Sequence, residues 1–338
     1  MGLERAKLSH RPIFIMGMYR SGTSMVAEVV HRWGAYGGDV KLLAKPDSRN
    51  PRGFWESDLI HTFSVALFRV KFLSLWHPDF GKELRQRADE PEFRDEAIRI
   101  TQEMASHNPI WFWKQPYLCL LLPFWKKVLE DITFIITVRN PYESALSWQK
   151  FLLPKEEGFD ERVSIIAANL LRWQYFMLTA LAETEGSRHR VFVDYDRFQA
   201  NPVGEARRLA GFLDAEYGRT SDEETIEQMG QAVAPDLHRQ RASRPFAEVP
   251  EATTEQQALD EYLRRKVDDP DLPFVPERYT LFPGWREYLM NIDLFRDYYG
   301  MANALLKRPT VRAAVAAEVP FRFLGQAYRG LRLRLAAR

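Results

Sequence analysis

The 338-residue chain has the composition of an ordinary soluble globular protein, with 46% hydrophobic and 28% charged residues. Its formal net charge is +1, so it lacks the global basic field that draws proteins to nucleic acid. The longest apolar stretches, residues 117–125 and 132–138, are too short to cross a bilayer. We therefore expect a soluble protein of one large or two smaller domains that binds no nucleic acid.

The single cysteine, Cys119, gives information on the cellular compartment and on the kinds of site that cysteines could form. One thiol excludes an intramolecular disulfide and leaves no cysteine cluster for zinc, which suits a reducing compartment. Its apolar neighbours favour a buried, inert thiol. The polar residues before Pro12 contain no apolar core of a signal peptide. We expect a cytoplasmic protein.

The stretch of residues 11–25 predicts a phosphate-binding loop. Residues 13–16 are an apolar run typical of a short buried strand, and Gly17 ends it. A hydroxyl-rich loop follows over residues 19–24, and helical spacing resumes over residues 25–33. A strand, a tight glycine loop and a helix together point backbone N–H groups and the positive end of a helix at an anion.

The loop resembles a Walker A motif in spacing but lacks its lysine. Gly17 and Gly22 are separated by four residues, as in that motif, but Thr23 stands where the lysine should be. The nearest cation is Arg20, inside the loop. A nucleoside triphosphatase needs that lysine and usually a carboxylate for Mg²⁺. The pattern favours a phosphate-bearing ligand without ATP chemistry, the alternative being an ordinary strand-to-helix turn.

A second anion contact is predicted at the end of the clearest strand, residues 132–138. This run is β-branched and apolar on both faces, as in a central parallel strand. Arg139 follows it, at the end of the strand where open α/β sheets place ligands. Pro141 suits the first turn of the next helix, and Ser147 lies two turns into that helix. A Walker B strand would end in Asp, so Arg139 argues against a Mg²⁺-nucleotide site.

Two further segments carry candidate side chains. Lys114 follows the aromatic run 110–113, and a lysine at the end of a buried strand needs its charge compensated. The loop over residues 50–56 places Trp55 beside Glu56. The aromatic residues around Trp55 and within residues 111–113 would suit the face of a sugar or of an aromatic ligand equally. For the aromatic residues beside Glu56, packing on the core is the alternative.

The order of the predicted elements indicates the fold. A third strand is predicted over residues 190–194, leading into Tyr195, and helices are predicted over residues 123–130, 163–184, 202–213, 222–233 and 255–267. Strands and helices alternate through about residue 215, which predicts an α/β fold with a central parallel sheet, like that of P-loop proteins, flanked by helices. We assign residues 1–276 to this domain and residues 277–338 to a largely helical extension.

The end of this extension is basic. Residues 321–338 carry five arginines among leucine, phenylalanine and tyrosine, without an acidic residue. Such a segment would suit packing on the domain, pairing of two copies in a homo-oligomer, or peripheral contact with the anionic inner face of a membrane. We favour packing or association over the membrane.

Together, these stretches resemble the sulfotransferases that use 3′-phosphoadenosine 5′-phosphosulfate (PAPS). Residues 17–24, with their Arg-Ser-Gly-Thr sequence, look like the 5′-phosphosulfate loop in the form common in bacterial members. Residues 139–147, with Arg and Ser eight residues apart, look like the 3′-phosphate motif. Two more segments are similar to family segments, residues 50–56 and residues 193–202. The resemblance covers residues 11–215, about two thirds of the chain.

This resemblance implies a role for each candidate residue. The 5′-phosphosulfate would be held by Arg20, Ser21, Gly22, Thr23 and Ser24. The 3′-phosphate of PAPS, or of its product PAP (3′-phosphoadenosine 5′-phosphate), would be held by Arg139 and Ser147, with Tyr195 near the adenine. Lys114 matches a family lysine that contacts the transferring sulfonate, where fixed cations such as Arg20 stabilise developing charge. The resemblance implies no metal.

The general base is not given by the family motif. Cytosolic members carry a catalytic histidine shortly after the lysine, whereas Gln115 follows Lys114 here. We choose Glu56, because several branches of the family use a glutamate in the segment after the first helix. Asp58 and His61 are rivals, and a structural role for Glu56 stays open.

We therefore predict a sulfotransferase that moves a sulfonate from PAPS to a hydroxyl by in-line attack. The acceptor would be a carbohydrate, a glycolipid or a small natural product. One alternative is a nucleoside-phosphate kinase, which Mg²⁺-dependent ATP turnover would reveal. Another is a non-catalytic or membrane-associated protein with a degenerate nucleotide site, which would bind the nucleotide without turnover.

Overall fold

The computed structural model describes residues 5–6, 8–39, 43, 52–68, 75–152, 162–233, 241–242 and 244–293. The chain divides into two compact units, residues 1–286 and 287–338, and every element discussed below lies in the first. The predicted boundary after residue 276 stays a prediction. The basic segment 321–338 and residues 50–51 lie outside the described residues.

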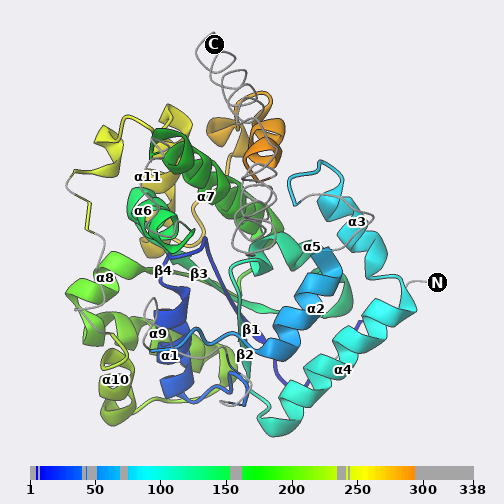
Figure 1. The fold of residues 1–338 in the computed structure, drawn as a ribbon. Helices are drawn as coiled ribbons and strands as arrows, with labels where there is room; N and C mark the ends of the chain where they lie inside the picture. The colour runs from blue at the N-terminus through cyan, green and yellow to red at the C-terminus, as the bar shows by residue number, and fades with distance from the viewer. Residues whose placement is uncertain are drawn as a thin grey trace, which may run out of the picture. The chain divides into compact units, whose positions relative to one another are not determined.

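A four-stranded parallel sheet in the order β2-β1-β3-β4 forms the centre of the first unit (Figure 1). The strands are β1 (Ile13–Met16), β2 (Phe112–Lys114), β3 (Thr133–Val138) and β4 (Arg190–Asp194). Every residue of these strands is buried, as their apolar sequences predict. The predicted α/β class with a central parallel sheet is confirmed.

Eleven helices are described around this sheet. They are α1 (Thr23–Trp33), α2 (Asp58–Phe68), α3 (Phe80–Arg87), α4 (Pro91–His107), α5 (Leu118–Val128), α6 (Pro141–Leu152), α7 (Arg162–Thr184), α8 (Tyr195–Ala200), α9 (Pro202–Tyr217), α10 (Glu223–Gly230) and α11 (Thr254–Asp268). Two short 3₁₀ turns, Phe246–Glu248 and Pro276–Tyr279, flank α11. Within the described residues, no helix is long and apolar enough to be a candidate membrane span.

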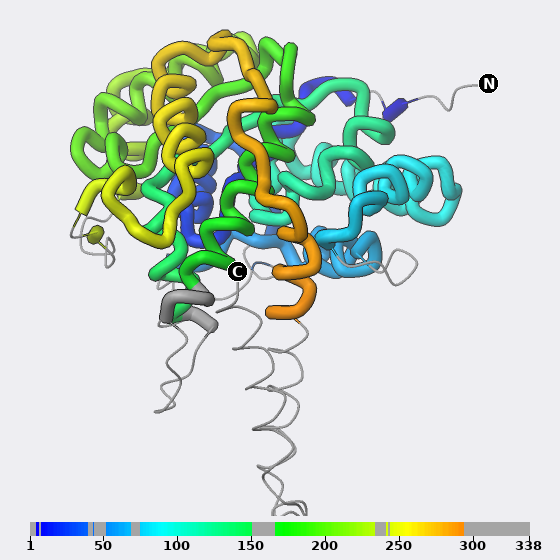
Figure 2. Tube along the Cα trace, turned by 90° about the horizontal axis from the view of Figure 1, so that it is seen from above, coloured from blue at the N-terminus to red at the C-terminus, as the bar shows by residue number. Residues whose placement is uncertain are grey.

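Alternate side chains of β1 point to opposite faces of the sheet and contact different helices there. Ile13 and Ile15 belong to a core cluster that also contains side chains of α1, α9 and α10. Phe14 points to the other face, where its ring lies 5.4 Å from that of Trp113 and 6.0 Å from that of Trp125 in α5. Further along the chain, α11 lies beside β4 and α7 (Figure 2).

Two expectations from the sequence are wrong. The helix expected over residues 123–130 begins at Leu118 and contains Pro123, because burial of side chains all around it outweighs the roughly 3 kcal/mol cost of an internal proline. Trp111 and Trp113 are 0% and 1% exposed, so they are core residues and cannot present a face to a sugar. The buried position of Cys119 is confirmed.

The turn between β1 and α1 depends on glycine. Gly22 precedes the first residue of α1 with φ of 95°, in the left-handed region. A Cβ atom at this position would lie 2.3 Å from Cδ2 of Tyr195, the residue that follows β4. The loop after β1 and the end of β4 therefore touch at a point where a larger residue does not fit.

We expect Gly22→Ala to destabilise the fold by about 2 kcal/mol or more, from the left-handed backbone and the overlap with Tyr195. Gly211→Ala is the control, because Gly211 lies inside α9, where an added Cβ atom would meet no neighbouring atom within 4 Å. That change should be neutral or stabilise by up to about 1 kcal/mol. Urea denaturation measures both, and equal effects would contradict this account of the turn.

Candidate active site

The first turn of α1 has the geometry of a candidate anion site. The backbone N–H groups of Thr23 and Ser24 lie in that turn, where no preceding helical carbonyl can accept them. No side chain caps this end among the described residues, since the capping position is Gly22. An uncapped helix start with a partial positive charge attracts a phosphate or sulfate group.

Ser21 is turned away from this helix end. Its hydroxyl lies 2.7 Å from the Thr137 hydroxyl of β3, and both groups are buried. Its backbone N–H donates to the Met18 carbonyl at 3.1 Å. Ser21 therefore shapes the loop, and its own N–H and hydroxyl are already engaged within the protein.

Arg20 connects the loop after β1 to the loop after β3. Its backbone has φ of 65°, a left-handed conformation that costs a residue with a side chain roughly 1 kcal/mol. Its carbonyl accepts a hydrogen bond from Arg139 Nη1 at 2.9 Å, and its own Nε donates to Ser147 Oγ at 3.0 Å. Strain held by such contacts is typical of functional sites.

Arg139 is buried, as its place at the end of β3 requires. Its Nη2 lies 2.9 Å from Glu143 Oε2, and its guanidinium lies over the Tyr195 ring at 4.4 Å. The structure thus brings Arg20, Arg139, Ser147 and Tyr195 together. Glu143 was missed by the sequence reasoning, although its position four residues after Arg139, at the start of α6, is the spacing of a helical ion pair.

Lys114 and Glu56 form a second buried pair. Lys114 Nζ lies 2.5 Å from Glu56 Oε1, and the lysine side chain is only 2% exposed while that of Glu56 is 25% exposed. Burial lowers the pKa of Lys114; the Glu56 carboxylate opposes this shift and the charge of Arg20 adds to it. Two cations and one carboxylate therefore meet beside the loop.

Contacts from α1 hold the segment that carries Glu56. Arg52 Nη2 donates to Glu28 Oε1 at 2.7 Å, and Arg52 Nη1 donates to the Ala232 carbonyl at 2.9 Å. The Ser24 hydroxyl donates to the Phe54 carbonyl at 3.3 Å. Glu56 is thereby tied to the same helix that begins at the anion site.

The rival residues lie on α2. Asp58 and His61 are both exposed. Gln115, which occupies the place expected for a catalytic group, is buried and accepts a hydrogen bond from the Ser64 hydroxyl at 2.7 Å. Its Nε2 lies 3.5 Å from His61 Nδ1. Gln115 therefore anchors α2 to the end of β2.

An aromatic cluster adjoins the loop. The Tyr19 ring stacks on Trp148 at 4.3 Å between centroids and meets the Tyr117 ring edge-on at 5.0 Å. These rings are half-buried. The sequence signal for them was their position next to motif residues, since Tyr19 precedes Arg20 and Trp148 follows Ser147. Trp55 instead packs on His31, with 4.7 Å between ring centroids.

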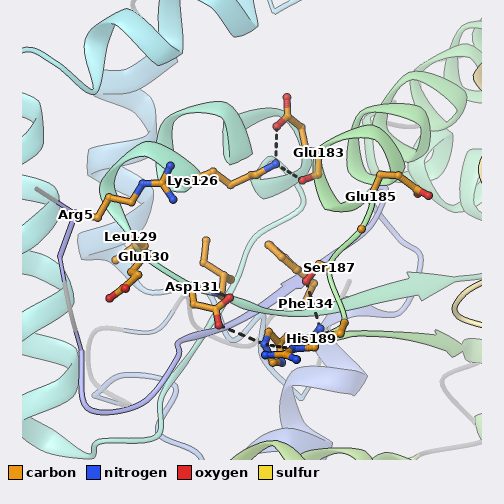
Figure 3. Close-up of a pocket in the computed structure, with 13 residues that line it drawn as sticks. Arg5, Lys126, Leu129, Glu130, Asp131, Phe134, Glu183, Glu185, Ser187 and His189 are labelled. Atoms are coloured by element: carbon orange, nitrogen blue, oxygen red, sulfur yellow. Dashed lines mark hydrogen bonds and ion pairs between the residues drawn. The ribbon is translucent and has the colours of Figure 1, made fainter. Parts of the chain in front are cut away.

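A hollow of about 410 Å³ lies at the other edge of the sheet, where β3 and β4 begin (Figure 3). Lys126 donates to Glu183 on one side of it. On the other side, His189 lies 3.4 Å from an Asp131 oxygen and 2.7 Å from a Glu216 oxygen. No predicted site residue lines this hollow, so it is not part of the candidate anion site.

The pair of Lys114 and Glu56 can be tested as a unit. Glu56→Gln should destabilise the fold, because it leaves the buried Lys114 charge uncompensated, and Lys114→Met should cost less, because the Glu56 carboxylate it leaves is partly exposed. The double variant should lose less than the sum of the two, with a coupling energy of about 1 to 3 kcal/mol. Denaturant unfolding of the four proteins measures this cycle. Additive losses would show that the two groups do not interact.

Comparison with known proteins gives the family. The model of the sulfotransferase family matches residues 12–219, which is more than half of the chain. No curated protein matches. Similar solved structures include sulfotransferase STF9 from Mycobacterium avium, with 18% identity over 80% of this chain and 79% of that chain and a TM-score of 0.46. Sulfotransferase STF1 from Mycobacterium tuberculosis H37Rv has 15% identity over 77% of each chain and a TM-score of 0.46. The sulfotransferase domain from the curacin biosynthetic pathway has 14% identity over 76% of this chain and 99% of that chain, with a TM-score of 0.44. On the family match, the chain belongs to the sulfotransferase family.

Proposed function

We propose that this protein transfers a sulfonate group from PAPS to a hydroxyl of a carbohydrate, glycolipid or small natural-product acceptor. The observation that carries the proposal is the convergence of three features at one edge of the sheet. These are the uncapped start of α1, the Arg20 side chain and the buried pair of Lys114 and Glu56. An activated sulfonate needs such an arrangement of fixed positive charge beside a potential base.

The residues fit a nucleotide with two anionic groups. The N–H groups of Thr23 and Ser24, with Arg20, would hold the 5′-phosphosulfate. Arg139, in the loop after β3, and Ser147, in α6, both contact Arg20 and would hold the 3′-phosphate. Tyr195 lies beside Arg139 and would take the adenine side. Anion binding here would compete with Glu143 for Arg139, so ion-pair exchange would accompany binding.

The chemistry follows from the same side chains. Bound PAPS would supply a sulfonate attached to a good leaving group, the phosphate of PAP. Lys114 is a buried cation in a region of low dielectric constant, where a fixed charge acts strongly on developing negative charge. Glu56 would accept the proton of the acceptor hydroxyl, and its contact with Lys114 fixes the carboxylate in place.

Two further features bear on the class of acceptor and on the cellular compartment. The half-buried rings of Tyr19, Tyr117 and Trp148 adjoin the loop, and aromatic faces suit the apolar face of a sugar ring or a natural product. Cys119 is the single cysteine of the sequence and is buried, so the chain forms no internal disulfide. We place the activity in the cytoplasm on that account.

The role of Arg139 is tested by comparing PAP with AMP, which lacks the 3′-phosphate. Arg139→Ala should weaken PAP binding about 10- to 100-fold, the value of a charge-assisted contact, and AMP binding much less. Isothermal titration calorimetry measures both, with a thermal melt to show that the variant is folded. Lys150→Ala, an exposed cation on the same helix as Ser147, is the control and should bind both ligands normally. Equal loss of PAP and AMP binding would refute the assigned 3′-phosphate contact.

The identity of the base is tested with three variants. Glu56→Gln should lower sulfonate transfer about 10²- to 10⁴-fold while PAP binding changes little, because a general base acts on the acceptor. Asp58→Asn and His61→Gln should retain transfer. The measurement is incorporation of ³⁵S from labelled PAPS into a pooled extract of oligosaccharides and glycolipids. Activity retained by Glu56→Gln and lost in Asp58→Asn would move the role to Asp58.

A further inference from the structure

We propose that Arg264, on α11, is a positioning residue for the nucleotide end of the site. It lies outside residues 12–219, the part of the chain that the family model matches. In this role Arg264 holds Asp194, and through Asp194 it fixes Tyr195 against Gly22 and Arg139. It rests on the proposed function only in taking PAP as the ligand.

Arg264 binds three carboxylates from three elements. Its Nη1 lies 3.3 Å from Asp194 Oδ2 at the end of β4, and its Nη2 lies 3.5 Å from Asp196 Oδ2 in α8. Its Nε lies 3.0 Å from Asp260 Oδ2, one turn earlier on α11. Asp194 and Asp260 have side chains that are only 3% and 10% exposed, so their charges need this partner.

Asp194 uses its two oxygens for different purposes. Oδ1 accepts the backbone N–H groups of Asp196 at 2.8 Å and of Arg197 at 3.2 Å, which caps the start of α8. Oδ2 is the atom that Arg264 binds. One oxygen of Asp194 thus holds the start of α8 while the other is held by Arg264, and together they fix the turn from β4 into α8. Tyr195 is the first residue of that helix.

Tyr195 transmits this orientation to the anion site. Its ring lies under the Arg139 guanidinium at 4.4 Å, and it occupies the space that a Cβ of Gly22 would need. Because both contacts are close, a small rotation of the ring changes the loop and Arg139 together. The path from α11 to the site thus consists of one ion pair, one helix cap and one ring.

The acidic groups around Arg264 make the effect of removing this arginine dependent on pH. Burial raises the pKa of Asp260 to about 6; Asp194 and Asp196 add to the rise, and Arg264 opposes it. Burial also raises the pKa of Asp196, with Asp194 and Glu143 adding to the rise and Arg264 and Arg139 opposing it. Without Arg264, the ionised carboxylates repel one another at alkaline pH, and protonation relieves that repulsion as the pH falls through the raised pKa values.

The test compares Arg264→Gln with Arg265→Gln, which changes the next residue on α11, an exposed one. PAP binding is measured by calorimetry at about pH 8 and about pH 5.5, each relative to wild type so that titration of the ligand cancels. We expect Arg264→Gln to weaken binding about tenfold at the higher pH and less than about threefold at the lower, the scale of one partly exposed charge pair. Arg264→Lys should restore part of the loss, and Arg265→Gln should match wild type.

Hydrogen exchange without ligand provides a second readout. The N–H groups of Asp196 and Arg197, which Asp194 caps, should exchange faster in Arg264→Gln and at the wild-type rate in Arg265→Gln. Unchanged exchange, or a loss of PAP affinity that is the same at both pH values, would overturn the positioning role. If wild type does not bind PAP, the proposed function fails, and the exchange result alone decides whether Arg264 positions the turn.

Discussion

The parallel register of the four strands is the constraint on which the site depends. Because all four strands run in one direction, their carboxyl ends lie at the same end of the sheet, where each strand is followed by a loop or a helix. β1 leads into the loop that contains Arg20, β2 ends at Lys114, β3 leads into Arg139 and β4 into Tyr195. Residues far apart in the chain are thus delivered to one place by the backbone alone.

Charge pairing is the second organising principle. Lys114 lies against Glu56, Arg139 against Glu143, and Arg264 against three aspartates. Burying an unpaired charge costs several kcal/mol, and the carboxylate partners compensate this cost for the buried cations. An anionic ligand at Arg139 would exchange for the Glu143 carboxylate instead of meeting a free cation, which links nucleotide binding to this ion pair.

Local patterns explain why much of the site was predictable from sequence. β1 and β3 are short apolar runs followed by a glycine loop or a proline-initiated helix, and such signals need no tertiary information. Non-local contacts explain what was missed. The inward turn of Ser21 depends on Thr137, Trp113 packs on Trp125 of α5, and the contacts of Arg264 join α11 to β4. No spacing within one segment reveals such partners.

The central claim is that a sulfonate leaves PAPS for a hydroxyl at this site. The most direct measurement incubates the wild-type protein with ³⁵S-labelled PAPS and a metabolite extract, and quantifies PAP and the labelled product in the same sample. We expect PAP and the labelled product in equal molar amounts, and a sulfate ester in that product. PAP formed only with free sulfate, or phosphate transferred from ATP under the same conditions with PAPS left intact, would contradict this claim.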